Sequence, residues 1–196
     1  MLSGLFHKLI DSVERSGIIL FFREVRHNPA AIGAVLPSSK ALATEIAFQA
    51  NQMPEGFIVE LGAGTGSITD ALLREGIAPE RIIVIERAAK LAAHLQQRYP
   101  QLRIIHGDAS HLSQLLGEDA PYVGAIVSSL PLLSLPARTV SAIRNQLKRV
   151  LKPHTLFIQF TYSFRRDNLS LGFRRLYSKR IWINIPPARV DIFQRY

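Results

Sequence analysis

The chain has 196 residues and no cysteine, so it can bury the core of one domain but offers no thiolate for a disulfide, a zinc site or a nucleophile. Its net charge of +9 is uneven, because residues 151–196 hold nine Lys and Arg against two Asp and Glu. No apolar run approaches the roughly 20 residues that span a bilayer, and early acidic residues disfavour a signal peptide. The basic end predicts an anionic partner, either nucleic acid or a membrane surface.

The first 50 residues predict helices. Residues 2–15 place Leu and Phe side chains at helical spacing, which indicates an amphipathic helix. This helix either packs on the domain or lies in a membrane interface, and the sequence favours neither. Pro37 ends the next stretch, and Ser38 or Ser39 can cap a helix over residues 40–49.

Strands and helices alternate after that segment. Predicted strands cover residues 57–61, 81–85, 102–106, 123–127 and 156–160, and predicted helices cover 68–74, 88–98, 112–116 and 139–151. This order predicts an α/β domain with a mostly parallel sheet and helices on both faces. The end of the chain predicts a helix over 169–177 and then a hairpin of residues 180–185 and 190–196 about a Pro-Pro turn.

The end of the first predicted strand carries the clearest site signal. Glu60 closes the strand, and glycines follow at alternate positions 62, 64 and 66 before a helix begins. Such a loop lets backbone approach a ligand closely at the carboxyl end of a strand. A purely structural turn rarely needs three alternating glycines.

The ends of the next three strands also carry polar groups. Glu86 can accept hydrogen bonds from both hydroxyls of a ribose, and the backbone of Asp108 and Ala109 can meet an adenine edge. Ser128 to Pro131 follow the fourth strand. Taken singly, Glu86 and Asp108 could be ordinary helix caps. Together these groups predict a nucleotide-type ligand at one edge of the sheet.

The spacing of the Gly-rich loop separates two classes of enzyme. Nicotinamide dehydrogenases use G-x-G-x-x-G, whereas residues 60–66 read E-x-G-x-G-x-G. This pattern resembles the first motif of the class I S-adenosylmethionine-dependent methyltransferases, over residues 57–160. The resemblance implies a Rossmann-like fold and S-adenosylmethionine as cofactor, with no metal. The residues that it implies for cofactor binding are Glu60, Gly62, Ala63, Gly64, Thr65, Gly66, Glu86, Arg87, Asp108, Ala109 and Ser128.

A narrower resemblance extends over nearly the whole chain. The segments 28–39, 129–133, 159–162 and 182–188 are similar to those of the bacterial soluble-type phospholipid N-methyltransferases. The resemblance implies stepwise methylation of phosphatidylethanolamine towards phosphatidylcholine by a cytoplasmic protein that associates peripherally with the inner face of the cytoplasmic membrane. It also implies that residues 1–50 include a segment that covers the cofactor, with Pro37, Ser38 and Ser39 near the cofactor. Residues 51–196 then form the methyltransferase domain, and the two segments together make one structural domain.

The resemblance also suggests where the acceptor binds. Tyr162 and Ser128 are the candidate catalytic residues, and no general base is identified. Candidate contacts to lipid or membrane are Leu130, Pro131, Arg165, Arg166, Arg174, Arg175, Lys179 and Arg180. For any single one of the basic residues, the simpler interpretation is a solvated surface charge.

Other functions are alternatives. In rRNA adenine dimethylases, an Asn-x-Pro-aromatic motif follows the fourth strand, whereas this chain has Ser129-Leu130-Pro131-Leu132. The missing aromatic residue removes a stacking platform for a flipped base, which disfavours a nucleic-acid partner. A small-molecule N-methyltransferase and a cofactor-binding regulator without turnover are further alternatives.

Overall fold

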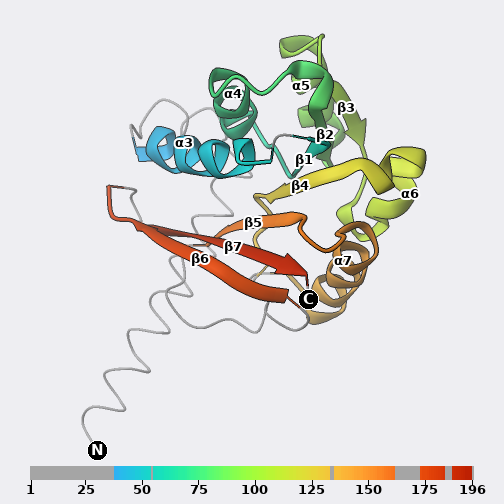
Figure 1. The fold of residues 1–196 in the computed structure, drawn as a ribbon. Helices are drawn as coiled ribbons and strands as arrows, with labels where there is room; N and C mark the ends of the chain where they lie inside the picture. The colour runs from blue at the N-terminus through green and yellow to red at the C-terminus, as the bar shows by residue number, and fades with distance from the viewer. Residues whose placement is uncertain (1–37, 54, 133–134, 162–172, 184–186, 196) are drawn as a thin grey trace, which may run out of the picture. The chain divides into compact units, whose positions relative to one another are not determined.

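The computed structural model describes residues 38–53, 55–132, 135–161, 173–183 and 187–195. These residues form a seven-stranded sheet in the order β3-β2-β1-β4-β5-β7-β6 (Figure 1). The strands are β1 Phe57–Leu61, β2 Ile82–Glu86, β3 Arg103–His106, β4 Val123–Ser128, β5 Leu156–Thr161, β6 Phe173–Ile181 and β7 Ala188–Arg195. Strands β1 to β5 are parallel, and β7 pairs antiparallel with both β5 and β6.

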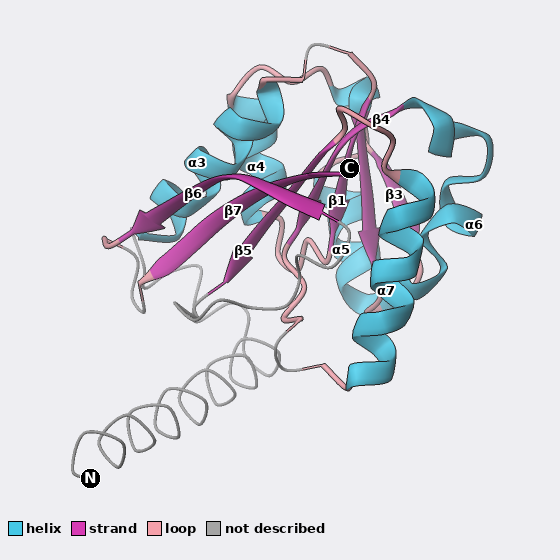
Figure 2. Cartoon of the chain, turned by 60° about the horizontal axis from the view of Figure 1, so that its bottom comes forward, coloured by secondary structure: helices cyan, strands magenta, loops and turns pink. Residues whose placement is uncertain are grey.

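Helices cover both faces of this sheet, as the near-continuous apolar strands require. The α-helices are α3 Ser38–Asn51, α4 Ser67–Arg74, α5 Ala89–Arg98, α6 Leu112–Leu116 and α7 Ala137–Val150, and the short 3-10 turns are η1 Pro79–Arg81, η2 Ala109–His111 and η3 Gly117–Tyr122. Figure 2 shows α3 and α4 on one side of the sheet and α7 on the other. The predicted elements over residues 40–160 are therefore confirmed, with ends that differ by at most two residues.

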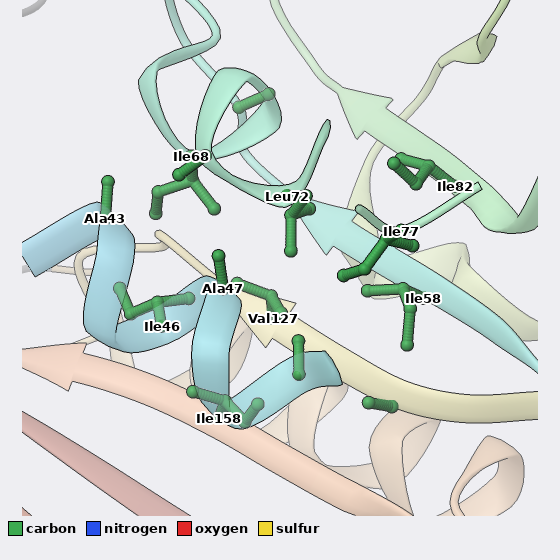
Figure 3. Packing of buried hydrophobic residues seen from close by; sticks show 14 of the residues in the cluster. Ala43, Ile46, Ala47, Ile58, Ile68, Leu72, Ile77, Ile82, Val127 and Ile158 are labelled. Carbon is green, nitrogen blue, oxygen red and sulfur yellow. The ribbon is translucent and has the colours of Figure 1, made fainter. Parts of the chain in front are cut away.

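Each face of the sheet has its own hydrophobic core. One core joins α3, α4 and α5 to side chains such as Ile58, Val127 and Ile158 (Figure 3). The other joins α6 and α7 to Val59, Phe157 and Phe193. Neighbouring residues of one strand thus point into different cores, and this alternation fixes the register of the strands.

The end of the chain differs from the sequence prediction. The antiparallel hairpin is confirmed, but its first strand runs from Phe173 to Ile181 and not over the predicted residues 180–185. The predicted helix over residues 169–177 is therefore wrong from residue 173 onward. The register of β6 shifts between Arg175 and Tyr177. This bulge places Phe173 and Tyr177 on opposite faces of the sheet, so the apolar side chains lose the period of two that marks a strand.

Two predictions concern residues outside the described part. The amphipathic helix over residues 2–15 lies there, so the division between residues 1–50 and 51–196 stays a prediction. Within the described residues, no helix is both long enough and apolar enough to cross a bilayer.

Candidate functional site

The Gly-rich loop joins β1 to α4 at the carboxyl edge of the sheet. Gly62, Gly64 and Gly66 have φ angles of 74°, 59° and 88°, which side chains with a Cβ rarely adopt. The amide of Gly62 donates to the carbonyl of Ile85, so the loop starts tied to the neighbouring strand β2. The sequence therefore needs glycine at all three positions to turn the backbone.

The surroundings of the three glycines differ. A Cβ on Gly62 would lie 2.9 Å from the side chain of Leu130, and a Cβ on Gly66 would lie 2.8 Å from the hydroxyl of Tyr99. Gly62 and Gly66 thus also allow close packing. A Cβ on Gly64 would have nothing within 4 Å. Gly64 is therefore the point where the loop borders open space that a ligand can enter.

Glu86 at the end of β2 holds the loop in place. Its Oε2 accepts a hydrogen bond from the amide of Gly64 at 3.0 Å, and its Oε1 accepts one from the amide of Ala88 at 2.8 Å. The side chain is buried, yet a carboxylate has about four acceptor positions, so both oxygens keep capacity for ligand hydroxyls. Glu86 can therefore support the loop and accept hydrogen bonds from a ligand at the same time.

Among the carboxyl groups of the described part of the chain, Glu60 has the most strongly shifted pKa. Burial, together with the weaker effect of the neighbouring acids Glu86 and Asp70, raises the pKa of its carboxyl to about 7 against the opposing hydrogen bond from Thr69. Its Oε2 accepts that bond from the Thr69 hydroxyl at 2.6 Å. Its Oε1 is buried and has no hydrogen-bond partner among the described residues. A ligand with a positive charge or an N–H donor would satisfy this oxygen.

Asp108 after β3 caps the turn η2, which is the simpler of the two roles that the sequence allows for it. Its Oδ1 accepts from the amide of Ser110 at 2.8 Å and begins the turn η2, while Arg87 lies 3.6 Å from Oδ2. Burial alone would raise the pKa of this carboxyl, but the Ser110 N–H and the Arg87 guanidinium outweigh it and lower the pKa. Asp108 is therefore ionised near neutral pH, and Arg87 is exposed beside it.

The end of α5 also holds the Gly-rich loop in place, through contacts that the sequence does not reveal. The Tyr99 hydroxyl lies 2.7 Å from Asp70 Oδ1 and 3.1 Å from the Gly66 carbonyl. Arg98 donates to the Thr65 carbonyl at 3.0 Å and pairs with Asp70. Burial and the Asp70 carboxylate raise the pKa of Tyr99, so its hydroxyl stays protonated and can donate. No local motif marks this pair, because the contacts join residues about 30 positions apart.

The segment after β4 presents two serines with different surroundings. Ser128 Oγ is buried and lies 3.4 Å from the amide of Leu130, from which it accepts. Ser129 Oγ is buried without a hydrogen-bond partner in the described part of the chain. Nearby, Gln159 of β5 donates to the Leu130 carbonyl at 3.2 Å, and its Oε1 also lacks a partner there. Ser129 and Gln159 therefore offer unused acceptors next to Ser128, the residue that the sequence predicts for this site.

The described basic candidates all lie on β6, and three of them have partners. Arg175 lies 3.7 Å from Asp191 and over the ring of Phe193, and Lys179 pairs with Glu45 of α3. Arg180 lies over the ring of Trp182. Arg174 is exposed. These side chains are thus spread along the edge strand and are not gathered at the loop.

Some predicted site residues cannot be placed. Pro37, Tyr162, Arg165 and Arg166 lie outside the described residues, and α3 begins at Ser38 and Ser39, whose side chains are also undescribed. In the described part of the chain, no group of three or more His, Cys, Asp or Glu side chains has the arrangement of a metal site.

The edge of the sheet thus carries an arrangement suited to one kind of ligand. Open space borders Gly64, an unpartnered carboxylate oxygen lies at Glu60, and the carboxylates of Glu86 and Asp108 follow on adjacent strands. Carboxylates accept from ribose hydroxyls and favour a nearby positive charge. A nucleoside that carries a sulfonium and an ammonium group fits these donors and charges.

Comparison with known proteins agrees with this arrangement. A family model described as a methyltransferase domain matches residues 58–154. An ornithine lipid N-methyltransferase from Singulisphaera acidiphila is 30% identical over 184 residues, which cover 86% of this chain and 91% of the relative. The chain belongs to the class I S-adenosylmethionine-dependent methyltransferases.

Solved methyltransferases share the fold and hold the cofactor. The 1,6-didemethyltoxoflavin-N1-methyltransferase of Burkholderia thailandensis, solved with S-adenosylhomocysteine, has a TM-score of 0.67 at 14% identity and covers 93% of this chain and 89% of its own. The magnesium protoporphyrin IX methyltransferase of Synechocystis PCC 6803, solved with S-adenosylmethionine, has a TM-score of 0.61 at 14% identity, with 81% and 80% covered. S-adenosylmethionine is the cofactor of this methyltransferase.

Ribosomal RNA methyltransferases match a smaller part of the chain. The ribosomal RNA small subunit methyltransferase A of Dehalococcoides mccartyi is 30% identical over 125 residues, which cover 61% of this methyltransferase but 40% of that relative. The similarity to RNA enzymes therefore leaves more than a third of this chain unmatched.

Proposed function

We propose that this methyltransferase transfers methyl groups to the amine of phosphatidylethanolamine and of its methylated intermediates, towards phosphatidylcholine. The reaction would take place at the surface of an anionic membrane, at the inner face of the cytoplasmic membrane. The observation that carries the proposal is the similarity to an ornithine lipid N-methyltransferase over nearly the full length of both proteins. That relative's name describes methyl transfer to a nitrogen of a lipid.

Bound S-adenosylmethionine supplies a methyl group on a positively charged sulfur, and a neutral amine takes it in one displacement. The residues of the chain have to orient the amine and exclude water. Ser129 directly follows β4, and Gln159 of β5 pairs with Ser128 at the end of β4, so the unpartnered oxygens Ser129 Oγ and Gln159 Oε1 can accept N–H bonds from an acceptor amine there. This would direct the lone pair of the nitrogen towards the methyl group. Solvent takes the released proton, and Tyr162 stays a candidate for the same orienting role.

The segment after β4 argues against a nucleobase as acceptor. Leu132 stands where adenine methyltransferases carry an aromatic residue, and its side chain is buried in the core on the α7 face. An aliphatic residue packed into a core cannot stack on a flipped base. A lipid amine needs no such platform.

An ornithine lipid is a second candidate acceptor. It is favoured by the same relative, whose name gives an ornithine lipid as the methyl acceptor. Both candidates present an amine on a lipid, so they use the same acceptor oxygens and differ in the rest of the headgroup.

The test supplies purified protein with radiolabelled S-adenosylmethionine and one of three acceptors: phosphatidylethanolamine vesicles, ornithine lipid vesicles or bare ribosomal RNA. We expect label in phosphatidylethanolamine. Label in the ornithine lipid alone would show that this lipid, and not phosphatidylethanolamine, is the substrate. Label in RNA alone would overturn the lipid proposal. Cofactor binding without transfer to any of the acceptors would instead favour a regulatory protein.

A serine substitution tests the proposed acceptor site. Ser129→Ala should lower turnover about tenfold or more and leave the affinity for S-adenosylhomocysteine unchanged, because it removes only an acceptor of the amine N–H. Ser141→Ala, which changes an exposed serine on α7, is the matched control. Equal turnover in the two variants would remove Ser129 from the site.

A further inference from the structure

The end of the β6–β7 hairpin exposes large apolar side chains. Trp182 and Ile183, which follow β6 directly, are 63% and 76% exposed. We call these two residues the hairpin tip. A folded protein rarely leaves adjacent bulky apolar side chains in water without a binding role, and Trp prefers the boundary between headgroups and acyl chains of a bilayer.

The topology places the hairpin tip at the ligand edge of the sheet. β7 runs antiparallel to β5, and β6 runs antiparallel to β7, so β6 points in the same direction as the parallel strands. Its last residue therefore lies at the same edge as the Gly-rich loop and Ser129. Thr161 pairs with Arg189, which pairs with Arg180, so the tip extends past the end of β5. Figure 1 shows this hairpin reaching beyond β5.

Positive charge lies next to the apolar tip. The Arg180 guanidinium lies 5.6 Å from the centre of the Trp182 ring, which is a cation–π distance. Lys179 neutralises Glu45 of α3, so that acid presents no unpaired charge to an approaching surface. Residues 151–196 carry nine Lys and Arg against two Asp and Glu. An apolar tip beside a cation is complementary to a bilayer with anionic headgroups.

We propose that the hairpin tip inserts into the headgroup region of an anionic lipid bilayer and so presents the ligand edge of the sheet to the membrane. Ser129 and the tip are separated by the width of three strand spacings, roughly 15 Å. A lipid whose headgroup lifts slightly from the bilayer can therefore reach the acceptor site. The proposed lipid substrate gives the reason why this protein would bind a membrane, and the inference rests on it in that respect. The evidence for the contact itself comes from residues outside the proposed acceptor site.

The chain offers a site-specific probe, because Trp182 is its only tryptophan. The full-length protein is mixed with phosphatidylglycerol vesicles or phosphatidylcholine vesicles, and Trp182 emission is recorded. We expect a shift to shorter wavelength and quenching by brominated acyl chains with the anionic vesicles, and a weaker effect with the zwitterionic ones. If the protein sediments with anionic vesicles while Trp182 emission stays that of a solvated indole, the proposal is wrong.

Substitution provides the second measurement. Ile183→Ser should lower partitioning onto anionic vesicles about tenfold, since it removes one apolar side chain that would be buried in the bilayer, and should leave S-adenosylhomocysteine binding unchanged. Tyr122→Ser is the matched control, because Tyr122 is 67% exposed but precedes β4 at the opposite edge of the sheet. Equal partitioning of the two variants contradicts the proposal, as does sedimentation evidence that Ile183→Ser only abolishes self-association.

Methylation assays separate this inference from the proposed function. If it is correct, Ile183→Ser methylates short-chain phosphatidylethanolamine dispersed in detergent at the normal rate and loses activity on vesicles. Trp182 insertion without methylation of any lipid would refute the proposed substrate and leave the hairpin assignment intact. Normal methylation of vesicles by Ile183→Ser would refute the hairpin assignment alone.

Discussion

At the scale of single residues, the site depends on a carboxyl group whose ionisation is costly. Glu60 lies at the end of β1, fully buried, with one oxygen bonded to Thr69 and the other unpartnered among the described residues. A pKa of about 7 means that the folded protein keeps a proton that the unfolded chain has already released. A cationic ligand would stabilise the ionised form of Glu60, so its binding should release this proton.

This arrangement predicts a pH-dependent stability. Without ligand, the unfolded chain loses the Glu60 proton near pH 4.5 and the folded protein loses it near pH 7, so stability should fall as pH rises through this window and level off above it. The loss due to Glu60 should be about 3 kcal/mol. Glu60→Gln keeps an acceptor for Thr69 and should lack this component. Urea unfolding of both proteins from pH 5 to 8 measures the difference, and identical slopes would contradict the pKa assignment.

The glycines allow a second prediction at this scale. Gly66→Ala should lower the free energy of unfolding by about 2 kcal/mol or more, because its Cβ would meet Tyr99 at 2.8 Å in a backbone with φ of 88°. Gly64→Ala should cost only about 1 kcal/mol but weaken S-adenosylhomocysteine binding at least tenfold, since its methyl group enters the open space. Calorimetric titration and urea unfolding separate the two effects. Unchanged cofactor affinity in Gly64→Ala would show that the cofactor does not bind next to Gly64.

At the scale of elements, the C-terminal end of α5 fixes the Gly-rich loop through Tyr99 and Arg98. Tyr99→Phe should destabilise the protein by about 1–2 kcal/mol, because Asp70 and the Gly66 carbonyl lose a donor. Arg103→Ala is the control, since it removes an ion pair to Asp119 that is partly exposed and worth little. Urea unfolding compares the two variants, and a Tyr99→Phe protein as stable as the control would show that α5 does not support the loop.

The elements also show what the sequence could predict. The parallel strands were found to within one residue at either end because buried runs such as Ile82–Glu86 carry their own apolar signal. The sequence does not reveal the edge strand β6 over residues 173–179, since its bulge breaks the period of two and only pairing with β7 makes it a strand. Likewise, the acids at strand ends were visible in the sequence, whereas Tyr99 and Gln159 needed the three-dimensional contacts to be found.

At the scale of the whole molecule, the chain has two candidate elements for contact with a membrane. The hairpin tip is one, and the predicted amphipathic helix over residues 2–15 is the other. Two weak attachments on one molecule act together, because the first raises the effective concentration of the second at the surface. Net charge concentrated in residues 151–196 would add an attraction that salt screens.

Deletion of residues 1–15 tests how these elements combine. The deletion should weaken partitioning onto anionic vesicles and spare cofactor binding, because the described cofactor site contains none of these residues. When the deletion is combined with Ile183→Ser, only the electrostatic attraction of the basic residues to the vesicles should remain. Salt at 0.5 M should then abolish vesicle binding, since the Debye length falls to about 4 Å. Vesicle sedimentation of the single and double variants at low and high salt measures this. A deletion that binds vesicles as well as the full chain would mean that residues 2–15 pack on the protein, leaving the hairpin tip and surface charge as the contacts that hold the enzyme at the membrane.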